Sequence, residues 1–135
     1  MKKLFFLFVF VFLSGSCSLK DDSENYHLEA LAVFEVDMPA YFEFGDTNQI
    51  TIRYKRPSNC HFFDGFILEK NDNTRTVAIQ SYVLEKNTCE DLVDVVEEVV
   101  MDFNVVNSST YIFKFWQGKD QNGDDIFLEF EVPVQ

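Results

Sequence analysis

Residues 111–132 read YIFKFWQGKDQNGDDIFLEFEV, and their pattern is typical of two strands joined by a turn. Apolar residues occupy every second position in both halves, namely Tyr111, Phe113 and Phe115 in the first and Ile126, Leu128, Phe130 and Val132 in the second. Alternation of this kind marks strands that bury one face. The pair Asn122-Gly123 lies between the two runs, and both residues tolerate the positive φ of a tight turn. The stretch therefore predicts a β-hairpin.

The same period of two continues over most of the chain after residue 27. Ile50, Ile52 and Tyr54 alternate with polar residues, and β-branched and aromatic residues dominate the other runs. Turn-forming residues separate these runs at 44–48, 57–59 and 71–73. About seven short strands at regular spacing predict one all-β domain, which would be an antiparallel β-sandwich or a small barrel.

Cys89–Val100 fits two patterns. Leu92, Val95, Val96, Val99 and Val100 fall at helical spacing, yet valine is frequent and the end of the segment also alternates. We interpret Glu90–Val93 as a short helical turn and Val96–Val105 as a strand.

The N-terminus has the layout of a secretory signal. Two lysines precede an uninterrupted apolar run, Leu4–Leu13, and small residues follow it up to Ser16. The run is shorter than the roughly 20 residues of a membrane-spanning helix, and it has no polar face for a buried core helix. We therefore expect residues 1–16 to be a cleaved signal peptide.

The residues around the expected cleavage site carry a resemblance. Leu13-Ser14-Gly15-Ser16-Cys17 resembles the lipobox of bacterial lipoproteins, although the usual leucine three places before the cysteine is Ser14 here. The resemblance implies a thioether-linked lipid on Cys17, with palmitate-type acyl chains that hold the protein on its membrane. This lipid is the one covalent group that we expect, and we expect no other cofactor.

Residues 17–27 are polar and lack a period, so we expect them to form a flexible acidic tether. The cluster Lys20-Asp21-Asp22 is similar to the acidic export tag of bacteroidete-type lipoproteins. That resemblance implies an outer-membrane lipoprotein on the cell surface, and a periplasm-facing position is the alternative.

Residues 28–135 form the expected β-sandwich domain. The order of runs in Pro39–Tyr54 and the stretch Ser108–Trp116 resemble parts of bacterial immunoglobulin-like domains. The whole chain is similar to the small lipoproteins of bacteroidete-type bacteria, a resemblance that implies no activity.

The chain has three cysteines, Cys17, Cys60 and Cys89. Lipidation of Cys17 would leave two, and an oxidising compartment favours a disulfide between them. A Cys60–Cys89 bridge would close a loop of about 30 residues and stabilise the domain by roughly 3 kcal/mol. Two free buried thiols are the alternative.

No motif indicates catalysis or metal binding. Neighbours on a strand point to opposite faces, so we interpret His61 as a surface histidine beside a disulfide partner, not as the base of a Cys/His pair. His27 and His61 are the only histidines, too few for a metal site, and Asp120–Asp125 fits a hairpin turn better than a calcium loop. The formal charge is −12, and removal of Lys2 and Lys3 with the signal gives −14. This charge argues against nucleic-acid partners.

Aromatic residues outside the expected core are the one candidate binding feature. Trp116 shares its strand face with Lys114, and Phe127 faces outward on the next strand. If they are neighbours, Trp116, Phe127 and Lys114 would form an exposed patch for a protein or glycan partner. We therefore expect a membrane-anchored, non-enzymatic binding or accessory module of the cell envelope. A small enzyme or enzyme inhibitor with a loop-built site and a structural subunit of an envelope complex remain alternatives.

Overall fold

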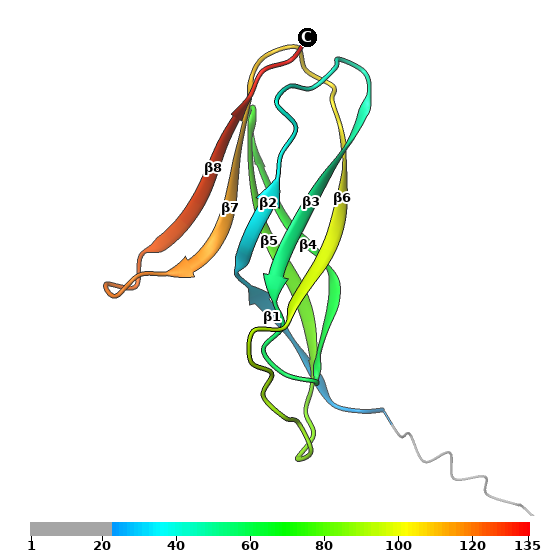
Figure 1. The fold of residues 1–135 in the computed structure, drawn as a ribbon, viewed down its shortest axis with the longest axis vertical. Coiled ribbons are helices and arrows are strands. Elements are labelled where there is room, and N and C mark those ends of the chain that lie inside the picture. Colours follow the sequence, from blue (N-terminus) through cyan, green and yellow to red (C-terminus); the bar gives the residue numbers. More distant parts are fainter. Residues whose placement is uncertain (1–22) are drawn as a thin grey trace, which may run out of the picture.

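The computed structural model describes residues 23–135, which form eight strands and no helix, so the predicted all-β class is confirmed (Figure 1). The strands are β1 (Tyr26–Leu31), β2 (Val33–Asp37), β3 (Thr47–Lys55), β4 (His61–Asn71), β5 (Thr74–Leu84), β6 (Val96–Asn104), β7 (Tyr111–Lys119) and β8 (Asp125–Val132). The first strand begins at Tyr26, two residues before the expected start of the domain. Within the described part of the chain, no helical segment could cross a membrane.

The strands form two sheets packed as a sandwich, as predicted. The three-stranded sheet has the order β2-β3-β6, and β5 is the centre of the five-stranded sheet. β4 pairs with one edge of β5, while β1 and β7 share the other edge end to end, and β8 pairs with β7. All pairings are antiparallel except that of β5 with β7, which is parallel over Thr74–Val77.

The predicted alternation places the core between the sheets. The inward residues of β3 and β7 are buried, as expected, and they meet buried residues of β5 and β6: Ile50, Ile52, Tyr54, Val77, Ile79, Met101, Phe103, Tyr111, Phe113 and Phe115. Phe42 lies in the crossing segment before β3 and is fully buried. Its ring centroid is 5.3 Å from that of Phe103 and 5.9 Å from that of Tyr111. Offset and edge-on contacts of this kind stabilise an aromatic core.

The expected helical turn at Glu90–Val93 is wrong. The backbone of this segment is bound to Pro57–Asn59 and not to itself: Leu92 N donates to Pro57 O at 2.9 Å, and Asn59 N donates to Glu90 O at 3.0 Å. A short bridge pairs Asp91 with Ser58. These partners hold the segment extended, and the strand that follows, β6, agrees with the predicted Val96–Val105 apart from its last residue.

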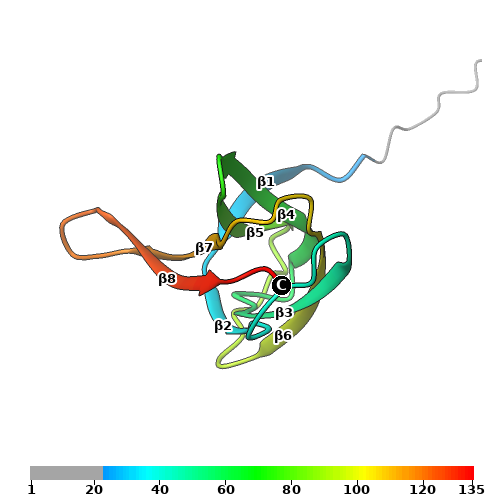
Figure 2. The same ribbon diagram turned by 90° about the horizontal axis from the view of Figure 1, so that it is seen from above.

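The β7–β8 hairpin projects from the body as an arm, which both views show (Figures 1 and 2). β7 pairs with β5 only as far as Phe115 and continues with β8 alone. The register shifts between Trp116 and Lys119, where Gly118 has φ +100°. L side chains rarely adopt this φ, so glycine allows the bulge that twists the arm.

Candidate binding surfaces

Lys114, Trp116 and Phe127 lie together on the outer face of the arm, and we call them the arm surface. Trp116 is the register partner of Phe127, so the expected pair are direct neighbours across the two strands. The Nζ of Lys114 lies 5.8 Å from the centre of the Phe127 ring and 3.2 Å from Glu129 Oε1. All three residues are half-buried, so the expected patch presents only part of these side chains to solvent.

Asp125 fixes the position of Trp116 at the end of the arm surface nearest the tip of the arm. Its Oδ1 accepts hydrogen bonds from Lys119 Nζ at 2.8 Å and from Trp116 Nε1 at 2.9 Å. Hydrogen bonds from Lys119 and then Trp116 lower the pKa of the Asp125 carboxyl from its usual 3.8. The indole is therefore held by a carboxylate that stays ionised at neutral pH.

A groove of about 580 Å³ lies between the arm and the junction of β1 and β2, and we call it the arm groove. Its lining is mainly apolar: Leu31, Ala32, Val33, Phe34, Lys55, Pro57, Gln117 and Ile126. Phe34 and Ile126 are exposed on its walls. Lys55 Nζ lies 5.0 Å from the centre of the Phe34 ring and 2.9 Å from Asp94 Oδ1, so the positive charge on this wall is paired with a carboxylate.

One border of the arm groove is a strand edge. Among the described residues β2 pairs with β3 alone, and its other edge faces β7 without strand hydrogen bonds. The one polar contact across this gap is from Gln117 Nε2 to Val33 O at 3.5 Å. An edge without a strand partner offers backbone donors and acceptors to an added strand.

A second apolar groove lies on the outer face of the five-stranded sheet at its β1 end. It measures about 400 Å³ and is lined by Tyr26, Leu28, Asp64, Tyr82 and Leu84. We call it the Tyr26 groove. Tyr82 is stacked on Phe62 with ring centroids 5.1 Å apart, which gives the groove a firm side. Nothing in the sequence pattern indicated it, because the five residues come from three strands.

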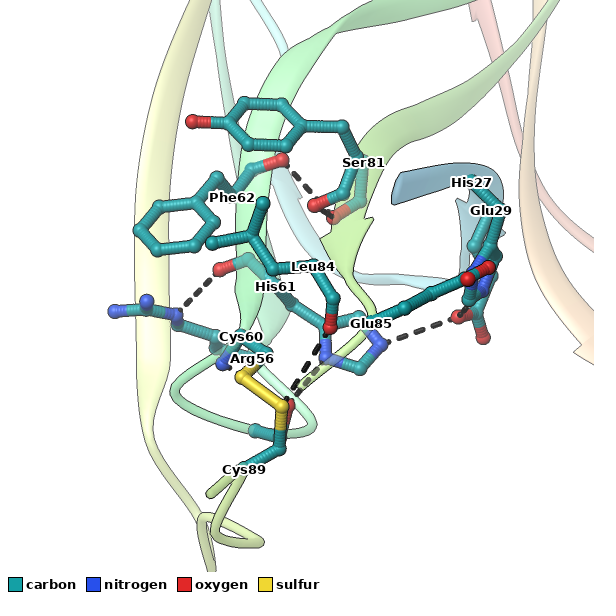
Figure 3. Close-up of polar contacts among 12 residues, drawn as sticks. His27, Glu29, Arg56, Cys60, His61, Phe62, Ser81, Leu84, Glu85 and Cys89 are labelled. Carbon is teal, nitrogen blue, oxygen red and sulfur yellow. Dashed lines mark hydrogen bonds and ion pairs between the residues drawn. A yellow bond between two sulfur atoms is a disulfide. The ribbon is translucent and has the colours of Figure 1, made fainter. Parts of the chain in front are cut away.

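Cys60 and Cys89 form a disulfide, which is the predicted pairing (Figure 3). Their Cα atoms are 5.6 Å apart. The bridge ties the irregular segment after β5 to the start of β4. Leu84 N also donates to Cys60 O at 3.0 Å, so both backbone and side chains join the two segments.

His61 is not the surface histidine that we expected, because its side chain is only 11% exposed. Its Nδ1 lies 2.7 Å from Ser58 Oγ. Its Nε2 lies 3.1 Å from Glu29 Oε2, as Figure 3 shows. A serine, a histidine and a glutamate that contact one another in this order suggest a hydrolytic triad. Ser58 is buried, however, and its Oγ also accepts the Cys60 N–H at 3.1 Å. The serine is engaged in the turn and cannot reach a substrate. The cluster therefore positions β1 against the disulfide.

Within residues 23–135, no group of three or more His, Cys, Asp or Glu side chains is arranged to hold a metal ion. The predicted hairpin turn at the arm tip is present. Asp120 Oδ1 accepts the backbone N–H groups of Asn122 at 2.8 Å and Asp124 at 3.0 Å. The Asp120 carboxylate is thus used to close the turn.

The expected signal peptide at residues 1–16 and the expected lipid site Cys17 lie outside the described residues. Searches of family models, curated proteins and solved structures found no match to the chain.

Proposed function

We propose that the chain is a lipid-anchored lipoprotein of the cell envelope that binds an extended segment of a partner protein in the arm groove, without catalysis. The anchor rests on the lipobox-like Leu13–Cys17 and the apolar run before it. The binding role rests on one observation, which is an apolar groove bordered by the unpaired edge of β2.

The groove suits an added β-strand. A peptide laid along β2 would form backbone hydrogen bonds with the free edge and insert alternate side chains between Phe34 and Ile126. Backbone pairing supplies affinity, and the apolar walls supply preference for apolar side chains. A chain with a formal charge of −12 favours a partner segment that carries positive charge.

A protein partner fits the arm better than a glycan does. Sugars stack on open aromatic faces, but the Phe127 ring has the Lys114 ammonium 5.8 Å from its centre. The Trp116 N–H is bonded to Asp125. The arm surface therefore offers little free ring face, whereas the arm groove offers an edge and an apolar lining.

The test is photo-crosslinking on intact cells with the full-length chain. A benzophenone-bearing phenylalanine analogue replaces Ile126 in the groove, or Ile67 on β4 as the matched control. The two isoleucines are 43% and 42% exposed, so general surface contact is equal. We expect a discrete crosslinked protein from position 126 and none from position 67.

The same test is repeated with the Phe34→Ser variant, which removes the aromatic side chain from one wall of the arm groove. We expect it to reduce the crosslink at position 126 about tenfold, in line with about 1.4 kcal/mol of lost binding. Equal crosslinking from both positions, or an unchanged yield in Phe34→Ser, would contradict the groove. A stoichiometric complex that survives purification would identify the structural-subunit form of the same role.

A further inference from the structure

We propose that the end of the sandwich bearing the Tyr26 groove rests on the surface of the lipid bilayer, with Tyr26 and Leu28 in the interfacial layer. This inference depends on the lipid anchor proposed above and adds an orientation of the domain, which the anchor alone does not specify.

The first described residues are held against the body of the domain, and they follow Cys17 closely in the sequence. Glu24 forms an ion pair with Lys86, and Glu85 N donates to Asn25 O at 2.8 Å. Seven peptide steps separate Cys17 from Glu24, which span at most about 25 Å even when fully extended. A lipid on Cys17 therefore keeps the start of β1 within that distance of the bilayer.

The surface nearest to this attachment has the chemistry of an interfacial contact. Tyr26 is 62% exposed and Leu28 is 57% exposed, and both line the Tyr26 groove with Tyr82 and Leu84. Tyrosine is enriched at membrane interfaces because its ring is apolar and its hydroxyl is wet. Exposed apolar residues gathered in this way mark a contact surface.

The charges around the groove specify the kind of lipid. Asp64 lines the groove. Glu85, which contacts His27, follows the groove residue Leu84 in the sequence, and Glu24, which pairs with Lys86, lies two residues before Tyr26. Carboxylates at this position disfavour anionic headgroups. The surface therefore suits neutral or zwitterionic headgroups.

The orientation leaves the proposed protein site free. Both views show β1 running from its start toward the side of the body that bears the arm (Figures 1 and 2), so Tyr26 and Leu28 line the Tyr26 groove at one end of this strand and Leu31 lines the arm groove at the other. A bilayer under the Tyr26 groove would point the arm groove away from the membrane, toward a partner.

The experiment uses depth-dependent quenching, because Trp116 is the only tryptophan. The full lipidated protein is reconstituted in phosphatidylcholine vesicles whose acyl chains carry bromine. Three proteins are compared: the native chain, Leu28→Trp in a Trp116→Tyr background, and Leu68→Trp in the same background. Leu68 is the matched control, since it is 53% exposed but pairs with Val77, well along β5 from the Tyr82 partner of Leu28.

We expect bromine to reduce the fluorescence of the Leu28→Trp protein about twofold, because an interfacial side chain lies only 5–10 Å into the headgroup boundary. The native and Leu68→Trp proteins should be quenched little. If all three proteins float with the vesicles but the Leu28→Trp signal is not quenched more than the other two, the orientation is overturned and the anchor stands. If the native chain lacks lipid on Cys17 and does not float, the anchor fails and the orientation fails with it.

Discussion

Trp116 and Asp125 form a hydrogen-bonded pair whose stability depends on the ionisation of the carboxyl group. The indole N–H donates to the carboxylate, and Lys119 binds the same oxygen. The folded pKa of Asp125 is lowered, so the stabilising contacts are present above the unfolded value and are lost as the pH falls through the folded value. We expect Trp116 fluorescence to change with a midpoint below pH 3.8.

A fluorescence titration of the folded protein between pH 7 and pH 2 measures that midpoint. Asp125→Asn removes the titrating group and should abolish the transition while leaving the indole with an acceptor. A midpoint above pH 3.8 in the native chain, or the same transition in the variant, would contradict the assignment.

Arg75 carries a buried positive charge at the edge of the aromatic core. Its Nη1 donates to Asp72 O at 2.7 Å and to Thr74 O at 3.0 Å, and its guanidinium lies 5.2 Å from the centre of the Tyr111 ring. Arg75→Lys keeps the charge but loses the planar stacking and the fork of donors, so we expect a loss of about 1 kcal/mol in the free energy of unfolding. Urea unfolding measures it. Lys70→Ala, at the exposed register partner of Arg75, should change stability by less than about 0.5 kcal/mol.

The segment between β5 and β6 depends on its covalent tie. It contains no strand or helix of its own. Besides the disulfide, it is attached by backbone hydrogen bonds to residues 25 and 56–59 and by the ion pairs of Lys86 with Glu24 and of Asp94 with Lys55. We expect Cys60→Ser/Cys89→Ser to lower the free energy of unfolding by about 3 kcal/mol, since the bridge restricts a loop of 30 residues in the unfolded chain. Urea unfolding without reductant measures this loss. Reduction of the native chain should give the same loss, and no effect of reductant would contradict it.

Strands with one buried face could be predicted from the sequence, and pairing between distant strands could not. The alternation in β3 and β7 identified Ile52 and Phe113 as core residues because a period of two directly reports burial. The Cys60–Cys89 pairing followed from counting cysteines. The extended form of Glu90–Val93 depends on hydrogen-bond partners 31 and 35 residues earlier, which no local pattern contains. The same holds for both grooves and for the parallel pairing of β5 with β7.

The whole molecule is a sandwich whose Tyr26 groove and arm groove are lined from the two ends of β1. We expect mass spectrometry of the mature protein to find Cys17 as the first residue, modified with acyl chains. Cys17→Ser should retain residues 1–16 and incorporate no labelled palmitate, because the sulfur that accepts the lipid is gone. A mature native chain that begins elsewhere, or that carries no lipid, would contradict the anchor.

The hydrogen bonds at Phe42 have a consequence for how the chain would mature under the proposed export. Phe42 N donates to Pro133 O at 2.9 Å, and Gln135 N donates to Phe42 O at 2.8 Å, so a fully buried ring is fixed by residues from the far end of the sequence. A chain that crosses a membrane from its N-terminus onward cannot complete this contact until residue 135 has emerged. Under the proposed export, closure of the core around Phe42 therefore follows the passage of residues 133–135, and the segment around Phe42 stays exposed to chaperones and proteases until then.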